Sequence, residues 1–243
     1  MAQIIFADRT YNSKNPLMRL SHRTRLKKSI EQIPQKDGLR ILDIGCGDGF
    51  FLNQLKESAK DTKIQLVGFE PYMKSINKNT IEIYKDWNEV LLNSNNNGKF
   101  DYLTCFEVLE HLNSYGQKEI LKKIIDVAHE KSKIIISVPI EKGPPAIIKN
   151  LIRRINYPQK KNIYNLRNIT KSVFKKPIPE CREGQEYLSH MGFYFDDLES
   201  IINKYFVIEK KEFSPFRYVG YYFNSQVFYT LLIKKKLVGN TQS

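Results

Sequence analysis

The segment ILDIGCGDGFF, Ile41–Phe51, decides the fold of this chain. It begins as a short apolar run with β-branched residues, passes through Gly45, Gly47 and Gly49, and then takes up helical apolar spacing. Glycine lets a backbone turn sharply and approach a ligand without a Cβ in the way. The segment therefore predicts a strand, a tight loop and a helix whose first N–H groups and positive dipole end are free for a ligand.

The spacing of the glycines excludes two common phosphate-binding loops. A dinucleotide fingerprint would place its third glycine at position 50, which is Phe50, and a P-loop would need a Gly-Lys-Ser/Thr sequence that is absent. Instead, Asp43 precedes the loop and Glu70 closes the next strand pattern. An acid at that position can accept hydrogen bonds from ribose hydroxyls.

Strand and helix patterns alternate along the chain on both sides of this loop. Strand patterns occupy residues 40–45, 63–70, 80–87, 100–107, 133–140, 207–213 and 226–235. Helical patterns occupy residues 17–33, 49–59, 72–79, 117–130, 145–155 and 195–206, and the asparagine-rich residues 93–99 predict a loop. This alternation predicts βαβ units and an α/β fold with a parallel sheet.

Length and composition are those of an ordinary globular protein. The 243 residues suffice for one sizeable domain, and 41% hydrophobic with 27% charged residues excludes wholesale disorder. We expect a single domain with a helical segment at 1–36, a core at 37–140, a basic insertion at 141–190 and closing elements at 191–236. The net charge of +13 favours an anionic partner.

The cysteines and the apolar runs indicate the cellular compartment of the protein. Cys46, Cys105 and Cys181 form neither a disulfide framework nor a zinc motif, which favours a reducing, cytosolic environment with buried thiols. The start of the chain, MAQIIFADRT, lacks the features of a signal peptide, and no run of 18 apolar residues predicts a membrane span. We expect a cytoplasmic protein.

With Asp43, the glycine loop, Glu70 and an acid at Asp86 after the third strand pattern, the chain resembles class I S-adenosylmethionine-dependent methyltransferases. The resemblance covers residues 37–140 and the last two strand patterns. It implies a Rossmann-like seven-stranded sheet, mostly parallel with an antiparallel last strand, and here a basic, largely helical insertion follows the fifth strand. A cofactor-free member of the fold, or another nucleotide-binding fold, stays the alternative.

The resemblance also implies roles for individual residues in binding S-adenosylmethionine. It places Asp43, Gly45, Cys46, Gly47 and Gly49 around the methionine part of the cofactor, with Phe106 and Glu107 lining the same side. It places Glu70 on the ribose, Pro71 beside the adenine, and Asp86 on the adenine amino group with Trp87 next to it. For Asp86 a turn or helix-cap role is the alternative.

The stretch FEVLEHL, Phe106–Leu112, carries two carboxylates and an imidazole. If it is helical, Glu107, Glu110 and His111 share one face, because residues three and four apart are helix neighbours. Three interpretations are open: a metal site, a catalytic acid–base group, or the polar side of a helix start.

A metal site would need another ligand, and the chain has four histidines: His22, His111, His129 and His190. We expect His22 and His129 to lie solvated on charged helices. The E-x-x-E-H pattern with a later histidine is similar to small-RNA 3′-end 2′-O-methyltransferases and to ubiquinone-pathway O-methyltransferases. That resemblance implies a Mg²⁺, Mn²⁺ or Fe²⁺ site formed by Glu107, Glu110, His111 and His190. Without an ion, His111 or a nearby carboxylate would act as general base.

The insertion contains a strongly basic stretch. Residues 143–179 hold nine Lys or Arg and no Asp or Glu. Within it, residues 145–155 predict a helix with an apolar face formed by Ile147, Ile148, Leu151, Ile152 and Ile155. Such a helix either lies on the inner face of an anionic membrane or forms a lid over the cofactor site with a solvated basic back. The charge favours a substrate with phosphates or carboxylates.

Three short motifs, SVPIEKGPP (137–145), SHMGF (189–193) and SPF (214–216), look like bacterial methyltransferases of surface-glycan synthesis. This resemblance implies O-methylation of a hydroxyl on a sugar, glycan, or other anionic or lipid-linked acceptor. The alternatives are a metal-dependent RNA 2′-O-methyltransferase and a non-catalytic cofactor-binding or membrane-surface protein. We expect most of the eight aromatic residues at 213–229 to fill the core, with stacking on sugar rings as the alternative.

Overall fold

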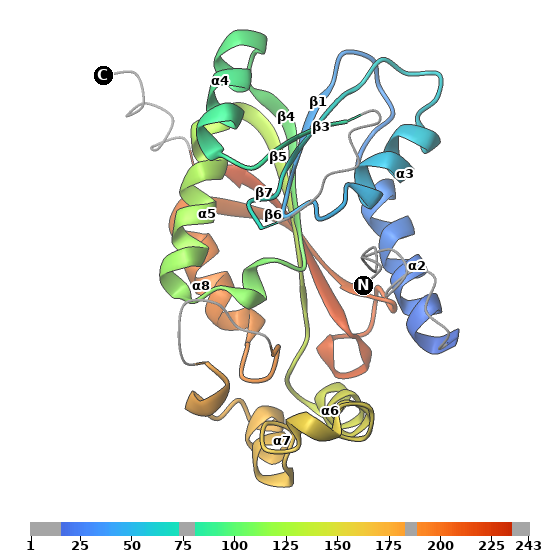
Figure 1. Ribbon diagram of the computed structural model, residues 1–243, viewed down its shortest axis with the longest axis vertical. Coiled ribbons are helices and arrows are strands. Elements are labelled where there is room, and N and C mark those ends of the chain that lie inside the picture. The colour runs from blue at the N-terminus through green and yellow to red at the C-terminus, as the bar shows by residue number, and fades with distance from the viewer. Residues whose placement is uncertain (1–15, 73–80, 183–188, 235–243) are drawn as a thin grey trace. The chain divides into compact units, whose positions relative to one another are not determined.

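The computed structural model describes residues 16–72, 81–182 and 189–234 (Figure 1). The helix predicted at 72–79 and the two ends of the chain therefore lie outside the described residues, apart from Tyr72. The described chain divides into two compact units. The first takes the residues up to Phe106 together with Ile124–Ile135, and the second takes Glu107–Lys123 and the residues from Ile136 onward.

The sequence prediction of a seven-stranded mixed sheet is confirmed. Its strands are β1 (Arg40–Ile44), β2 (Gln65–Phe69), β3 (Glu82–Tyr84), β4 (Phe100–Phe106), β5 (Ala128–Pro139), β6 (Phe206–Ser214) and β7 (Gln226–Ile233). Their order in the sheet is β3-β2-β1-β4-β5-β7-β6. β1 pairs in parallel with β2 and β4, whereas β7 runs antiparallel to β6.

The described α-helices alternate with these strands. They are α2 (Pro16–Glu31), α3 (Phe50–Ser58), α4 (Trp87–Asn97), α5 (Ser114–Val127), α6 (Pro144–Asn156), α7 (Leu166–Val173) and α8 (Phe195–Tyr205). In the first unit, α2 and α3 lie on one side of the strands and α4 lies on the other (Figure 1). Asp196 and Asp197 occupy the first turn of α8, where acids suit the helix dipole.

Helix α4 corrects the expected strand end at 87 and the expected loop at 93–99. The Asp86 carboxylate accepts the N–H of Asn88 and so caps the helix at its start. Asn93 is buried, and its side chain accepts a hydrogen bond from Arg40 and donates to Glu82. Tertiary bonds of this kind outweigh the turn preference of an asparagine-rich segment.

Strand β5 begins at Ala128, five residues before the predicted start at 133. His129 therefore lies on a strand and not on a helix, and its side chain is partly buried. Its Nε2 atom lies 3.1 Å from a carboxylate oxygen of Asp101. The expectation of a solvated helical His129 is wrong because the strand pairs earlier than the apolar run alone indicates. The side chain of His22 is not described.

The first unit has a continuous apolar core beneath the glycine loop. Its buried members are Ile33, Ile41, Cys46, Phe51, Leu52, Leu55, Leu66, Ile81 and Ile135. Cys46, Cys105 and Cys181 are buried and form no disulfide with one another, as expected for small apolar side chains. Since α3 contributes Phe51, Leu52 and Leu55 to this core, the loop that precedes α3 is held between a packed strand and a packed helix.

One glycine in this core has no room for a side chain. A Cβ built on Gly68 would lie 2.6 Å from the Cys46 Sγ atom and 3.0 Å from Ile83 Cγ1. We expect Gly68→Ala to lower the free energy of unfolding by about 1–3 kcal/mol, because overpacking shifts both neighbours. Urea denaturation measures this, with Gly220→Ala as the control because a Cβ there meets no atom within 4 Å. Equal losses in the two variants would contradict the expectation.

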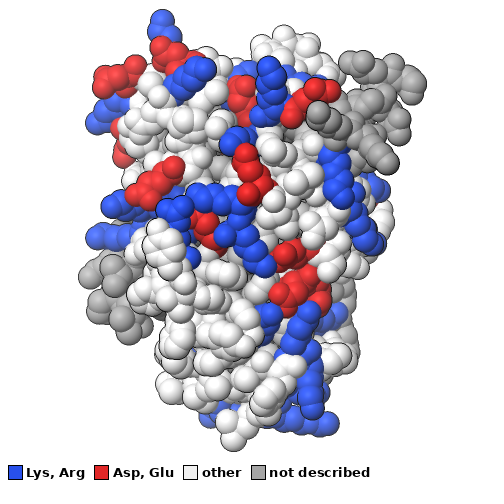
Figure 2. All heavy atoms as spheres, turned by 180° about the vertical axis from the view of Figure 1, so that it is seen from behind, with Lys and Arg blue, Asp and Glu red and all other residues white. Residues whose placement is uncertain are grey.

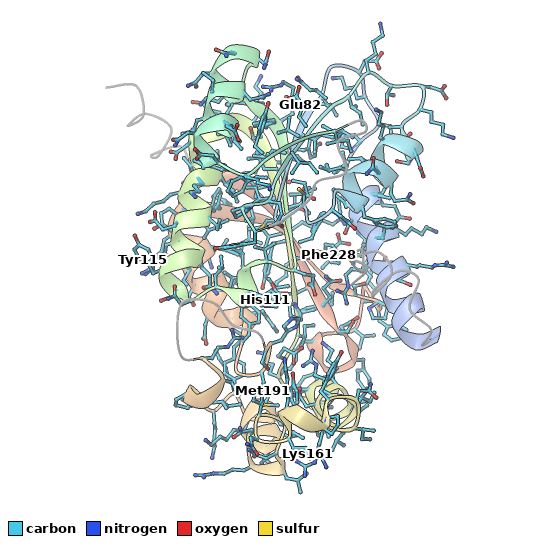
Figure 3. All side chains as sticks on the ribbon, in the orientation of Figure 1. Glu82, His111, Tyr115, Lys161, Met191 and Phe228 are labelled. Carbon is cyan, nitrogen blue, oxygen red and sulfur yellow. The ribbon has the colours of Figure 1, made fainter. Side chains whose placement is uncertain are left out.

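The second unit has a smaller core around the insertion. Tyr164, Ile169, Ile178, Cys181 and Met191 pack together there. α6 packs against α7, and Asn165 caps α7 by accepting the N–H of Asn168. The described part of the predicted basic insertion thus contains helices α6 and α7 and contributes to an apolar cluster of its own, in which Met191 is labelled in Figure 3.

Candidate functional site

The glycine loop after β1 has the tight conformation that the sequence predicts. Gly45, Gly47 and Gly49 have φ angles of 75°, 55° and 78°, which lie in the left-handed region. The Gly45 N–H donates to the carbonyl of Phe69 at 2.8 Å and fastens the loop to the end of β2. A Cβ on Gly47 would meet no heavy atom of the described residues within 4 Å, so the loop borders open space.

Glu70, the acid that follows β2, contacts this loop directly. One oxygen of its carboxylate accepts the Gly47 N–H and the other accepts the Tyr72 N–H, each at 3.1 Å. Its own N–H donates to the carbonyl of Tyr84 at 2.9 Å. Open space beside a glycine loop and a carboxylate fixed at its edge fit the methionine and ribose parts of S-adenosylmethionine.

Asp43 lies buried at the other side of the loop, on β1. It accepts a 2.6 Å hydrogen bond from the Thr104 hydroxyl of the neighbouring strand β4. Burial raises the pKa of Asp43 to about 7, and the negative charge of Glu70 acts in the same direction, while the Thr104 hydrogen bond opposes them. A cation placed beside this carboxylate would be stabilised, which fits the ammonium group of the cofactor's methionine part.

Asp43 gives the first unit a specific pH dependence. Its folded pKa lies above the unfolded value, so the charged form is disfavoured in the fold, and its stability contribution falls as pH rises from about 4 to about 7. Above pH 7 we expect Asp43→Asn to have a higher free energy of unfolding than the wild type, by about 3 kcal/mol. Denaturant titration measures this difference. The advantage should vanish near pH 4, whereas exposed Asp61→Asn should show no such trend.

The side chains expected around the adenine have defined places in the first unit. Asp86 caps α4, so the helix-cap interpretation is correct, while its contact with the adenine stays a prediction. Trp87 is buried edge-to-face against Phe69, with ring centroids 5.1 Å apart. Pro71 is exposed just beyond β2. These positions leave the adenine roles of all three residues open to test.

Phe106 ends β4 at the same edge of the sheet as the glycine loop. The register pairs Asp43 with Thr104, so the carboxyl ends of β1 and β4 lie side by side. The Phe106 ring packs edge-to-face on Phe51, at the start of α3, with centroids 5.1 Å apart. Its place beside the methionine part of the cofactor stays a prediction.

The chain bends sharply after Phe106 and does not start an α-helix. Glu107 has a φ of 56°, in the left-handed region, and only Leu109–His111 form a short 3₁₀ turn. The condition under which Glu107, Glu110 and His111 would share one α-helical face is therefore not met. The Glu107 carboxylate instead accepts a 2.7 Å hydrogen bond from Gln226, the first residue of β7.

Glu110, His111 and His190 nevertheless gather in the second unit, although Glu110 and His190 are 80 residues apart in sequence. Each offers a ligand atom, and these atoms lie within 4.8 Å of one another. The two imidazole rings meet edge-to-face at 4.7 Å, and Nε2 of His111 lies 4.0 Å from the buried Glu110 carboxylate. His111 lies between β4 and α5 (Figure 3). The structure thus unites three of the four predicted metal ligands and leaves Glu107 out of the group.

This group fits a divalent ion after small movements of its side chains. Ligand bonds of about 2.0–2.2 Å need donor atoms no more than about 4.4 Å apart. Two imidazoles with one carboxylate form a donor set that transition-metal ions accept. The His190 Nδ1 atom is buried and makes no hydrogen bond within the described chain, as a ligand atom awaiting an ion would be.

Glu141 is a neighbour of this group that the sequence analysis missed. Its side chain has no exposed surface, and it accepts two hydrogen bonds from Arg153, at 2.6 and 2.9 Å. Burial acts to raise its pKa, but the cations of Arg153 and Lys149 hold that pKa well below the usual range. Its position directly after the fifth strand pattern was the one available signal.

His190 is neutral at physiological pH. Burial lowers its pKa to about 3, and this effect outweighs the opposing attraction of Glu141, 4.0 Å from its Nδ1 atom. Arg182 fixes the backbone on both sides of the group, because it donates to the carbonyls of Glu110 at 2.6 Å and His190 at 3.1 Å. Nothing in the sequence pattern singled out Arg182.

The glycine loop, the Glu70 contact and the strand order define a class I S-adenosylmethionine-binding fold. A family model described as "Methyltransferase domain" matches residues 18–171, more than half of the chain. The chain therefore belongs to this methyltransferase family and is an S-adenosylmethionine-dependent methyltransferase. No protein of curated function matches its sequence.

Solved structures share the fold at low sequence identity. A protein from Pyrococcus horikoshii OT3 has a TM-score of 0.59 and 17% identity, over 95% of this chain and 97% of its own. Magnesium protoporphyrin IX methyltransferase from Synechocystis PCC 6803 with bound SAH has 0.53 and 13%, over 91% and 89%. The N-methyltransferase NodS from Bradyrhizobium japonicum WM9 has 0.50 and 12%, over 91% and 99%. At these identities the likeness concerns the fold alone.

Proposed function

We propose that this methyltransferase acts on a hydroxyl group of a sugar-bearing or other anionic acceptor. The observation that carries the proposal is the group of Glu110, His111 and His190, which begins four residues after Phe106 at the end of β4. When bound, the cofactor supplies a methyl group on a positively charged sulfur. A neutral hydroxyl attacks such a methyl group slowly unless its proton is removed. One of these three residues can accept that proton.

His111 suits the role of general base because it is the accessible member of the group. Its side chain is 41% exposed, whereas the Glu110 carboxylate is fully buried and His190 is mostly buried. An acceptor hydroxyl can reach the His111 ring and transfer its proton there. The Glu110 carboxylate, 4.0 Å from Nε2, stabilises the resulting imidazolium.

The same residues support a second version of this function, in which a divalent ion activates the hydroxyl. Three donor atoms within 4.8 Å, with an unbonded Nδ1 on His190, favour it. An ion such as Mn²⁺ or Mg²⁺ held by Glu110, His111 and His190 would lower the pKa of a ligated hydroxyl and orient it. Both versions transfer the methyl group to a hydroxyl. A chelator such as EDTA should abolish the reaction only in the version that uses an ion.

The basic insertion favours an acceptor with phosphates or carboxylates. Residues 143–179 hold nine cations and no acid, and although Lys149 and Arg153 pair with Glu141, the segment keeps a net positive charge that attracts anions. A nucleotide-linked or lipid-linked sugar carries both a hydroxyl and phosphates. RNA carries them too, and it stays the competing acceptor.

A transfer assay with isotopically labelled S-adenosylmethionine tests the proposal. The acceptors are nucleotide-linked sugars, lipid-linked sugars and short RNA, each with and without EDTA, and NMR of the product locates the methyl group. We expect methyl on a sugar oxygen. Methyl on nitrogen or carbon would overturn the proposal, and bound cofactor without transfer to any acceptor would favour the non-catalytic alternative.

A further inference from the structure

Helix α6 presents its apolar side to solvent. Ile148 is 64% exposed and Ile155 is 77% exposed, and Leu151 and Ile152 between them are exposed as well. The spacing of these four residues places them on one face of the helix. A surface helix normally buries such a face against its own protein, so this one is available to something else.

The opposite, polar side of α6 holds the helix to the protein. Asn150 is buried on that side, and Arg153 pairs with the buried Glu141. Lys149 donates to the carbonyls of Ile140 and Ser225, each at 2.9 Å. The solvated basic back that the lid alternative assigned to this helix is therefore wrong for Lys149 and Arg153, because both form internal bonds.

The aromatic segment before β7 extends this exposed surface. Gly143, at the start of α6, lies against the Tyr221 ring, and α6 packs beside the 3₁₀ turn η4 (Tyr221–Phe223). Phe223 is 71% exposed and Tyr222 is exposed too. The apolar face, as we use the term, comprises Ile148, Leu151, Ile152, Ile155, Tyr222 and Phe223. Phe216 and Tyr218 are exposed as well, so four of the eight aromatic residues at 213–229 are exposed. The expectation that most of them fill the core is therefore wrong.

The segment that contains α6 and continues to residue 179 carries charges of one sign. Lys161, Arg167 and Lys176 are exposed on the segment that follows α6, and residues 143–179 contain no acid. The lowest part of the surface in Figure 2 carries Lys and Arg side chains and no Asp or Glu. A second copy of this chain would bring two such positive segments together, which opposes self-association through this face.

We propose that the apolar face docks on an anionic lipid bilayer, with α6 lying parallel to the membrane surface. No helix of the described residues is long and apolar enough to cross a bilayer. The 13 residues of α6 span about 20 Å, which suits a helix lying in the interface. The surrounding cations attract anionic headgroups, and the aromatic rings of η4 suit the boundary between headgroups and acyl chains. This docking goes beyond the proposed reaction and does not depend on it.

Vesicle flotation of the full chain tests the docking. The vesicles consist of phosphatidylcholine alone or of an equimolar mixture with phosphatidylglycerol. We expect the wild type to float with the anionic vesicles, and Ile148→Glu and Ile155→Glu to lower the bound fraction by about tenfold each. Leu92→Glu on α4, where the leucine is 60% exposed, is the matched control and should float like the wild type.

The outcomes separate the possible occupants of the face. Wild type that does not float with anionic vesicles, or Ile148→Glu that floats unchanged, would overturn the proposal. A dimer in sedimentation that Ile148→Glu dissociates, without vesicle binding, would assign the face to a second copy instead. Melting by circular dichroism checks that the variants fold, and Ile155→Ser serves as a milder variant for the same comparison.

Discussion

Arg153→Met should lower the free energy of unfolding by about 3–5 kcal/mol, the largest stability loss that we expect from one substitution in this chain. The Glu141 carboxylate has no exposed surface and takes two of its hydrogen bonds from Arg153. Without the guanidinium, the buried negative charge has a weaker cationic neighbour in Lys149, whose Nζ atom lies 3.5 Å from it. Methionine fills much of the space that arginine leaves, so the loss reports the uncompensated charge.

A double substitution separates charge from packing in this experiment. Glu141→Gln together with Arg153→Met removes both charges and should recover much of the lost free energy of unfolding. The reason is that burying a neutral side chain costs less free energy than burying an unpaired anion. Arg167→Met, at an exposed position on α7, should change the free energy of unfolding by less than about 0.5 kcal/mol. A double variant as unstable as the single one would show that the ion pair is not the cause.

The pH dependence of this pair has a definite sign. The folded pKa of Glu141 is depressed, so its stabilising contribution is present above the unfolded value near 4.5 and is lost as pH falls through the folded pKa. The gap between wild type and Arg153→Met should therefore be widest at neutral pH and should shrink in acid. Guanidinium denaturation at several pH values measures it.

His111→Asn should lower kcat by about 10²- to 10⁴-fold once an acceptor is found, since removal of a general base or of an ion ligand affects the chemical step. Its affinity for S-adenosylhomocysteine should stay within about twofold of the wild type, because the residues expected to bind the cofactor are the glycine loop and Glu70 and not His111. His129→Asn is the control, since His129 pairs with Asp101 in the first unit. An unchanged kcat would remove His111 from the reaction.

Calorimetric titration of Mn²⁺ distinguishes the two versions of the proposed chemistry. With S-adenosylhomocysteine saturating the protein, one ion per chain that His190→Ala no longer binds would assign the group to metal-assisted transfer. No ion binding, with activity that persists in EDTA, would assign His111 as the base. Both results are compatible with the loss of kcat in His111→Asn, so the titration and the kinetics answer separate questions.

The alternation of patterns predicted the sheet because apolar runs and glycines are local signals. β1, β2 and β4 lie within two residues of their predicted ends, whereas β3 ends three residues before its predicted end. Helix α4 was missed because the bond that stabilises it, from Arg40 to Asn93, joins residues 53 positions apart. No reading of the asparagine-rich segment by itself could supply that contact.

For the candidate site, the sequence predicted residue types better than their geometry. Helical spacing would place Glu107, Glu110 and His111 on one face. The left-handed bend at Glu107 instead turns its side chain to Gln226. His190 was expected in the group through a family resemblance, and the structure places it there. Arg182 could not be foreseen, because it acts through backbone carbonyls that carry no sequence signature.

The inside-out orientation of α6 has an evolutionary consequence. Selection for folding acts on its charged positions, since Arg153 is tied to Glu141, and these two should therefore change together among relatives. Ile148 and Ile155 contribute little to folding, so a lineage that no longer needs the exposed face can replace them with polar residues freely. Polar substitutions at Ile148 and Ile155 among relatives would therefore indicate that the partner of the exposed face has been lost. A substitution at Arg153 would indicate that the buried surroundings of Glu141 have changed.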